Sequence, residues 1–272
     1  MKLSKRILVM ALVLTFVFGV VNMVAADDHT NGPWYTDTSN YYGNVPYNMG
    51  LNAEILQYGN NDSAAITQSG ENYAHIGQGI DYRFTPSATG SSADNVATIG
   101  ETGVMNEGEV NQRGTDNLAD IDQYGTDNYA GVGQNGEDMA AFVYQNATRS
   151  FVRASQFGGE TSTVFVEQQG DLNRIRTRQQ GDYHFARVEQ EEGSFFNYAS
   201  LEQRGDSQTA FIYQAGQKNG ALVEQAGFGN WAKVKQLGDH NGATVDQNNS
   251  NGLSALVKQL GNDNDASIVQ TN

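Results

Sequence analysis

Hydrophobic and polar positions alternate along most of the chain in short runs that recur every eleven residues. Between residues 117 and 145, one parity carries Ala, then Ile or Val, then Gln, and Gln123, Gln134 and Gln145 end three successive runs. A polar segment such as residues 124–127 (YGTD) follows each run. Alternation over seven residues followed by a Gly/Asp/Asn segment predicts a strand and then a turn. Each unit is therefore interpreted as half a coil of a β-solenoid.

The eleven-residue unit persists almost to the last residue. The residue that ends each run, here called the anchor, is Gln in 18 of 19 units, with Glu101 the exception. The anchors lie at positions 57, 68, 78, 101, 112, 123, 134, 145, 156, 168, 179, 190, 203, 214, 225, 236, 247, 259 and 270. The position two residues earlier is Ile or Val in 16 units, four earlier Ala in 15, and six earlier Asn in 11. Such self-similarity predicts an all-β protein, a cross-β solenoid of about 9.5 to 10 two-strand coils with about 22 residues per coil. At about 4.8 Å per coil, its length would be about 45 Å.

The spacing departs from eleven in a few places. Extra residues fall between anchors 156 and 168, 190 and 203, and 247 and 259. The longer gap between Gln78 and Glu101 is expected to hold one further, degenerate unit around residues 81–90, where Pro86 lies. This unit is predicted to be a distorted half-coil or a bulged loop.

The period of two decides which side chains point inward. The apolar pair must be inside, so the Asn and Gln of the same parity are inside as well. A buried amide is unfavourable when unpaired, but in a stack each amide can donate to the identical side chain one coil away. The predicted glutamine ladder comprises Gln57, Gln68, Gln112, Gln123, Gln134, Gln145, Gln179, Gln203, Gln214, Gln225, Gln236, Gln247, Gln259 and Gln270. The predicted asparagine ladder comprises Asn95, Asn106, Asn117, Asn128, Asn173, Asn197, Asn219, Asn230, Asn241 and Asn264.

The other parity and the turns carry the charges. Stacking two units apart predicts an acidic stripe of Glu202, Glu224 and Asp246, which is either screened by salt or holds cations. It also makes Arg153 and Arg176 neighbours, a hypothetical contact for an acidic polysaccharide. Carboxylates recur in the turns, at Asp62, Asp116, Asp127, Asp171, Asp182, Asp206, Asp239 and Asp263. They reflect a turn preference for Asp, repulsion that slows premature stacking, or calcium binding.

The first 26 residues are typical of a secretory signal peptide. Lys2, Lys5 and Arg6 precede an apolar stretch from 7 to 21, and residues 24–26 (VAA) offer small side chains for cleavage after Ala26. An uncleaved anchor is the alternative, but the apolar run is short for a span and no later segment could cross a bilayer. Residues 27–50 are polar and are interpreted as an extended leader, and residues 51–272 as the repeat domain.

Charge and composition exclude several classes of function. Without the signal, 13 of the 16 basic residues remain against 31 acidic ones, a net charge of −18 (13 − 31), which argues against nucleic acid or an anionic membrane as partner. The chain contains no Cys, so disulfides contribute nothing to its stability. The four His are scattered, and no thiol nucleophile, GxSxG, phosphate loop or metal-ligand cluster is present. We therefore expect no enzyme activity, no cofactor and no metal.

Residues 123–130 (QYGTDNYA) followed by Gln134 resemble the curlin repeat, in which Gln, Gly, Asn, Ala and Gln hold the same relative places. The resemblance covers about residues 51–272. It implies a secreted subunit of curli, the extracellular amyloid fibres of Gram-negative biofilms, which passes the periplasm and leaves through a dedicated outer-membrane pore. It also implies a nucleating partner subunit, and a role for residues 27–50 in targeting to the pore. Here the coils are about twice as many as in the familiar curlin, and the Ser of alternate units is mostly absent.

Two further hypotheses accompany the expectation of a self-assembling fibre subunit. The repeat continues to Gln270, so both ends are expected to lack caps and to stack on further copies. The regular last unit favours the major subunit over a minor, nucleating one. The alternative from another class is a monomeric β-solenoid adhesin that presents its Tyr- and Arg-bearing faces.

Overall fold

The computed structural model describes residues 20–26, 52–57, 61–79 and 92–271. This part of the chain consists of strands and turns without a helix, so no helix in it could span a membrane. The predicted leader at 27–50 and the predicted unit at 81–90 lie outside it. Of the predicted signal segment, only residues 20–26 are included.

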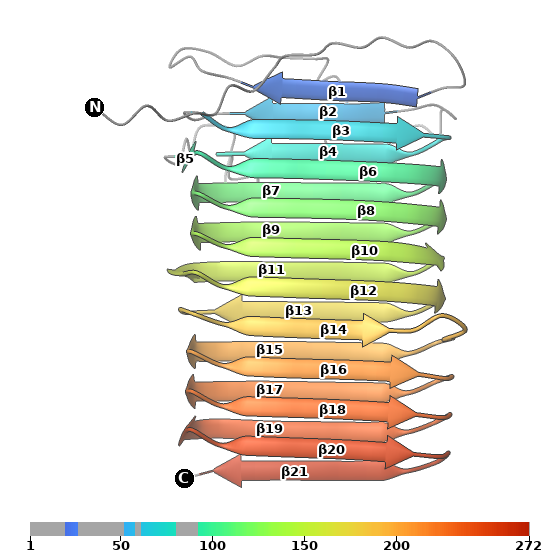
Figure 1. Ribbon diagram of the computed structural model, residues 1–272, viewed down its shortest axis with the longest axis vertical. Coiled ribbons are helices and arrows are strands. Elements are labelled where there is room, and N and C mark those ends of the chain that lie inside the picture. The colour runs from blue at the N-terminus through green and yellow to red at the C-terminus, as the bar shows by residue number, and fades with distance from the viewer. Residues whose placement is uncertain (1–19, 27–51, 58–60, 80–91, 272) are drawn as a thin grey trace, which may run out of the picture.

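The strands alternate between two parallel sheets that face each other along the whole stack (Figure 1). The first, here called the β2 sheet, contains β2 (Asn52–Gln57), β4 (Tyr73–Gln78), β7 (Glu107–Thr115), β9 (Tyr129–Glu137), β11 (Phe151–Glu160), β13 (Arg174–Gln180), β15 (Tyr198–Asp206), β17 (Gly220–Phe228), β19 (Gly242–Asn251) and β21 (Asp265–Thr271). The second, the β3 sheet, contains β3 (Ser63–Ser69), β6 (Val96–Val104), β8 (Leu118–Thr126), β10 (Ala140–Thr148), β12 (Thr163–Asp171), β14 (Phe185–Gln190), β16 (Thr209–Ala215), β18 (Trp231–Leu237) and β20 (Ser254–Leu260). These 10 and 9 strands make 19 half-coils, so the predicted β-solenoid is confirmed.

Two strands, β1 (Val20–Ala26) and β5 (Ser92–Ala93), lie outside this alternation. β1 pairs antiparallel with β3, whereas the solenoid strands pair in parallel. β5 pairs with the end of β7. The described residues place β3 directly beside β6 and β4 directly beside β7.

Each strand pairs with its counterpart one coil away in the register of the repeat, for example Ala119 with Ala141 and Gln123 with Gln145. The extra residues between anchors 156 and 168, 190 and 203, and 247 and 259 lie in irregular segments that do not change this register. A bulge in β11 lies between Phe157 and Glu160, and β19 shifts against β17 after Gln225. The insertion after Gln190 forms a turn in which Phe195 makes isolated bridges. The inward positions consequently stay aligned through all three irregularities.

The core is a single apolar layer between the sheets. It is built in most strands from an inward Ala and an inward Val, Ile or Leu, and Ala119, Ile121 and Val245 are fully buried. Tight turns join the strands. At Gly125, φ is +110°, and an added Cβ would lie 2.0 Å from the carbonyl oxygen of Ala147 in the next coil. Glycine is therefore required at position 125, near the end of β8, by its positive φ and by the close approach of the next coil.

Candidate functional site

The glutamines form a continuous side-chain ladder through the β2 sheet. Each Nε2 donates to the Oε1 of the next coil at 2.7 to 3.0 Å, in the order Gln57, Gln78, Gln112, Gln134, Gln156, Gln179, Gln203, Gln225, Gln247 and Gln270. Every step runs in the same direction. The ladder therefore has a polarity, with Gln57 offering an acceptor at one end and Gln270 a donor at the other.

A second glutamine ladder runs through the β3 sheet. It begins with Gln68, which donates to Glu101, and continues in the order Gln123, Gln145, Gln168, Gln190, Gln214, Gln236 and Gln259 at 2.7 to 3.0 Å. The two ladders include all fourteen predicted glutamines. They also include Gln78, Gln156, Gln168 and Gln190, which the anchor period identifies but the predicted ladder omitted.

The ladders satisfy the buried amides almost completely. Gln134 is 2% exposed, and its Nε2 donates both to Gln156 and to the main-chain oxygen of Leu118 in the opposite sheet, at 2.9 Å each. Its Oε1 accepts from Gln112. Gln134 thus connects its own coil to both neighbouring coils and to the facing strand, and most ladder glutamines make the same bond to a main-chain oxygen. These bonds remove the penalty for burying a polar group.

Glu101 is the one carboxyl group among the anchors, and it is 2% exposed. Gln68 donates to its Oε2 at 2.8 Å, while its Oε1 lies 3.0 Å from the Oε1 of Gln123. Two acceptors at that distance repel each other unless Glu101 carries a proton or the Gln123 amide is turned so that Nε2 faces Glu101. Turning the amide would bring the Gln123 oxygen to 2.9 Å from the Oε1 of Gln145. Desolvation by burial raises the pKa of Glu101 to about 8, against the lowering effect of the bond from Gln68. A protonated Glu101 donates to Gln123 and continues the ladder, because Gln123 can then keep its donation to Gln145.

The asparagines lie one residue before the strands and act mainly on the main chain of the next coil. The Oδ1 of one coil accepts the N–H of the corresponding residue one coil later, at 2.8 to 3.3 Å, for Asn72, Asn95, Asn106, Asn117, Asn128, Asn173, Asn197, Asn219, Asn230 and Asn241. Asn264 is the last member and donates to Asn241. Direct amide-to-amide bonds accompany some of these steps, such as Asn117 to Asn95 at 2.9 Å. The asparagines therefore join successive turns mainly through side-chain-to-main-chain bonds, and only in part through a side-chain ladder.

Other residues fill the asparagine position when they provide an acceptor. Ser150 Oγ accepts the N–H of Asn173, and Ser162 Oγ accepts that of His184. His184 is buried, its Nε2 lies 3.1 Å from the oxygen of Gln180, and its Nδ1 accepts the N–H of Gln208. Burial lowers the pKa of His184, which favours the neutral ring with one donor and one acceptor. His184 therefore takes the structural place of an asparagine in this row.

The turn carboxylates have identifiable structural roles. Asp116, Asp127 and Asp263 have φ between +55° and +57°, a left-handed conformation that Asp tolerates better than most residues. Asp182, Asp206 and Asp239 accept main-chain N–H groups from the preceding coil at 2.8 to 3.4 Å. Asp62 occupies the asparagine position and accepts from Asn95. The described residues contain no group of three or more His, Asp or Glu side chains arranged to hold a metal.

The outer faces differ in charge. On the β2 sheet, Glu202, Glu224 and Asp246 are direct neighbours, and Arg178 and Arg204 approach Glu202 at 3.8 and 2.6 Å. Arg153 and Arg176 are also neighbours and line an open hollow of about 490 Å³. Binding of cations or polysaccharide at these places stays a prediction.

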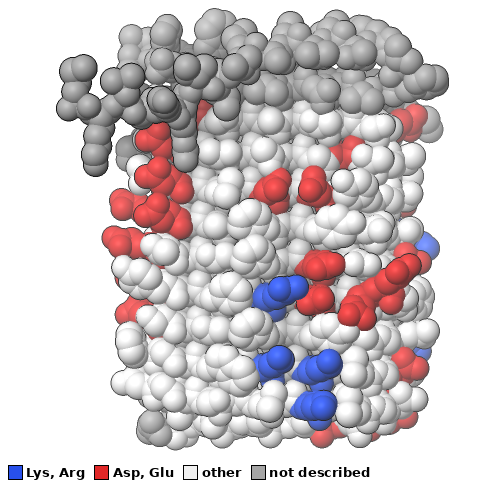
Figure 2. Space-filling view, in the orientation of Figure 1, with Lys and Arg blue, Asp and Glu red and all other residues white. Residues whose placement is uncertain are grey.

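The outer face of the β3 sheet carries aromatic and basic side chains. Phe142, Phe165, Phe185, Phe211 and Trp231 form a row with ring centroids 4.9 to 6.4 Å apart. Lys233, Lys235 and Lys258 lie near its C-terminal end, where Figure 2 shows the basic groups of this face gathered in the lower half. Acidic groups lie farther up the same face and also beside the uppermost basic group.

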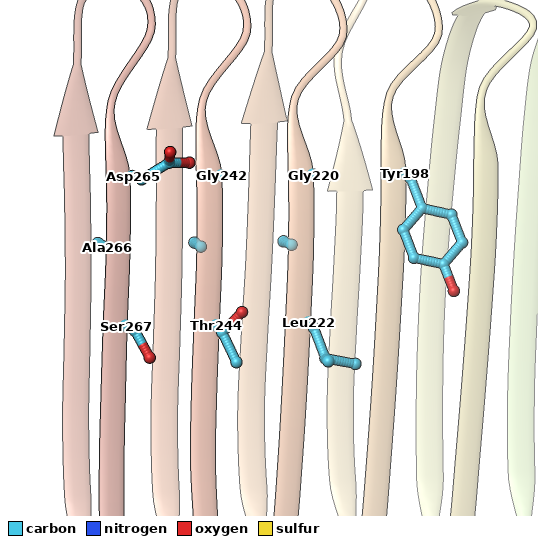
Figure 3. Close-up of a pocket in the computed structure, with 10 residues that line it drawn as sticks. Tyr198, Gly220, Leu222, Gly242, Thr244, Asp265, Ala266 and Ser267 are labelled. Carbon is cyan, nitrogen blue, oxygen red and sulfur yellow. The ribbon is translucent and has the colours of Figure 1, made fainter.

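One further hollow, of about 540 Å³, lies on the outer face of the β2 sheet near the C-terminal end (Figure 3). Gly220 and Gly242 leave a gap between the ring of Tyr198 and the carboxylate of Asp265, and Leu222, Thr244 and Ser267 form a parallel row. It is a shallow recess made by missing side chains. Its lining offers no pair of groups suited to acid–base or nucleophilic chemistry.

Fold and interior together define a parallel β-solenoid in which side-chain amides align successive coils. The chain matches the curlin associated repeat four times, at residues 103–136, 114–146, 197–227 and 219–248. It is a curlin-repeat protein. A search among curated proteins finds no match.

Proposed function

We propose that the chain is a structural subunit that self-assembles into extracellular, curli-type amyloid fibres. The observation that carries this proposal is the polarity of the glutamine ladders: each ends in a donor at β20 or β21 and begins with an amide at β2 or β3. In the last strand, Ala266 and Ile268 are only partly buried, although their counterparts Ala243 and Val245 in β19 are buried. A further coil from another copy would complete both the ladder and the core.

The mechanism of growth would be template-directed addition. The edge of a folded end coil pairs with an incoming chain, and the ladders set its register, since a slip by one residue turns every buried side chain outward. Secretion by way of the signal segment and an outer-membrane pore, with residues 27–50 as targeting segment, belongs to the same proposal. So does a role in adhesion and biofilm matrix. Catalysis is not proposed, because the repeat family and the fold are those of structural subunits.

A monomeric adhesin is the second candidate, favoured by the neighbouring Arg153 and Arg176 on an outer face. An assembly experiment distinguishes the fibre subunit from the monomeric adhesin. Residues 27–272, purified in denaturant and desalted, should give sigmoidal thioflavin T growth whose lag is removed by seeds, and fibre diffraction near 4.7–4.8 Å. A chain that stays monomeric in sedimentation and ignores seeds would support the adhesin instead.

A further inference from the structure

The first and last solenoid strands of the described stack belong to the same sheet. β2, the first solenoid strand, and β21, the last strand, both lie in the β2 sheet, because the described stack contains an odd number of half-coils. The β3 sheet therefore ends one half-coil inside the stack at each end, with β3 and β20. This parity restricts how one copy can follow another.

If the next copy in the fibre is placed beyond β21 by translation alone, the β3 sheet contains a gap at the junction. If β2 of the next copy pairs with β21, then β3 of that copy and β20 lie two strand spacings apart, about 9.6 Å. One row of the β3 sheet is then empty, and its flanking main-chain groups have no partner. In the full chain β1 occupies this row beside β3. However, β1 falls in the predicted signal segment, so the exported chain would lack it.

A half turn about the solenoid axis removes the defect. The rotation places β2 of the next copy in the β3 sheet, next to β20, and β3 of that copy in the β2 sheet, next to β21. Strand directions match, because facing strands of a coil run in opposite directions. The inward residues also match, since both sheets carry the same sequence of Ala, Val or Ile and Gln. Gln259 then faces Gln57, and Gln270 faces Gln68, so both ladders continue with unchanged polarity.

Charge also favours the rotated arrangement. Aligning Gln57 with Gln259 places Glu54 beside Leu256 and diagonal to Lys258, at the lysine-bearing end of the β3-sheet face. Translation instead places Glu54 beside Ser267, with Asp246 and Asp265 close by on the acidic end of the β2-sheet face. Opposite charges on neighbouring strands stabilise a sheet and like charges destabilise it.

We infer that successive copies in the fibre are related by a half turn about the solenoid axis, with β2 of one copy paired to β20 of another and β3 to β21. This inference rests on the proposed fibre. It makes two copies, about 90 Å, the repeat of the fibre. Each side of the fibre then alternates between the aromatic and lysine-bearing β3-sheet face and the acidic and arginine-bearing β2-sheet face.

Thiol cross-linking tests the pairing, because the chain has no Cys of its own. The test uses residues 27–272 in three double variants: Glu54→Cys with Leu256→Cys, Ala65→Cys with Ser267→Cys, and Glu54→Cys with Ser267→Cys. The first two pairs are neighbours only after a half turn, and the third only after translation. Within one copy, the two thiols of each pair lie near opposite ends of the solenoid, so every cross-link joins two copies.

Fibres of each variant are first verified by electron microscopy and seeding, then treated with a short bifunctional thiol reagent and dissolved in acid. We expect covalent multimers from the first two variants and monomers from the third. Multimers from the third variant alone, or from none of the verified fibres, would overturn the half-turn arrangement. Failure of the unsubstituted chain to form any fibre is a separate result, which refutes the proposed function itself.

Discussion

The glutamine and asparagine rows run side by side through every coil but are satisfied in different ways. A glutamine amide bonds to another glutamine amide, so each step needs the same side chain on both sides. An asparagine oxygen bonds to the main-chain N–H of the next coil, which is present whatever residue follows. Met139 accordingly follows Asn117 and still donates its N–H to it, at 3.2 Å.

This difference explains the sequence variation at the two positions. The anchor is Gln in 18 of 19 units, whereas Asn fills 11 of its 19 places and Ser, His, Asp, Gln, Met and Leu fill others. Uniformity is required where a side chain is both donor and acceptor for its own kind. Where the partner is the backbone, any residue with a suitable acceptor is sufficient, and an occasional Met or Leu is tolerated.

The largest expected effect is a break in the middle of a glutamine ladder. Gln179→Met keeps the length of the side chain but removes its hydrogen bonds with Gln156, Gln203 and the main-chain oxygen of Thr163. One buried acceptor left unsatisfied, on Gln203, together with two further lost hydrogen bonds, should lower the free energy of unfolding by about 2–6 kcal/mol. Guanidinium unfolding followed by circular dichroism measures the change. A loss no greater than that of Asn197→Ala would contradict the distinction between the two rows.

At Glu101 the glutamine ladder of the β3 sheet should be interrupted in a pH-dependent way. Its pKa rises from 4.5 to about 8 on folding, so its stabilising contribution is complete below about 4.5 and is lost as the pH rises through about 8. Between pH 6 and 10 the free energy of unfolding of the chain should fall by up to a few kcal/mol, whereas that of the Glu101→Gln variant should not show this fall.

Hydrogen exchange can localise this loss to β3, β6 and β8. Gln179→Glu should transfer the same alkaline sensitivity to the middle of the β2 sheet. If unfolding of the chain and of Glu101→Gln showed the same pH dependence, the protonated link to Gln123 would be excluded.

The sequence predicts most of this site because the repeat is regular. Parity and the eleven-residue period place Ala, Val and Gln inside, and identical amides at identical heights must meet. The main-chain partner of the asparagines was not predictable, since it depends on the turn that brings the N–H of the next coil to Oδ1. Nor does the period reveal that β3 and β6 are direct neighbours although Gln78 and Glu101 are 23 positions apart.

Substitutions in the asparagine row should lower stability less than those in the glutamine row, and more residue types should be tolerated there. Asn197 accepts the N–H of Asn219 and donates to the oxygen of Gly216, at 2.8 and 2.9 Å. Asn197→Ala should cost about 1–3 kcal/mol. Asn197→Ser should recover part of that loss, because Ser150 makes the same bond to Asn173. Equal unfolding midpoints for the Ala and Ser variants would show that the accepted N–H contributes nothing.

The smallest effect is expected at the turn residue that precedes an asparagine. Asp116 has φ +55°, and Asp94 and Asp138 hold the same conformation one coil away on either side. Asp116→Ala should cost about 1 kcal/mol through the left-handed conformation, and Asp116→Asn should change stability and seeded growth very little. If stacked carboxylates instead slowed assembly, Asp116→Asn would shorten the thioflavin T lag while leaving the unfolding midpoint higher or unchanged. Comparing Asn with Ala at this position therefore separates backbone preference from charge repulsion, since only repulsion makes the neutral amide assemble faster than the native carboxylate.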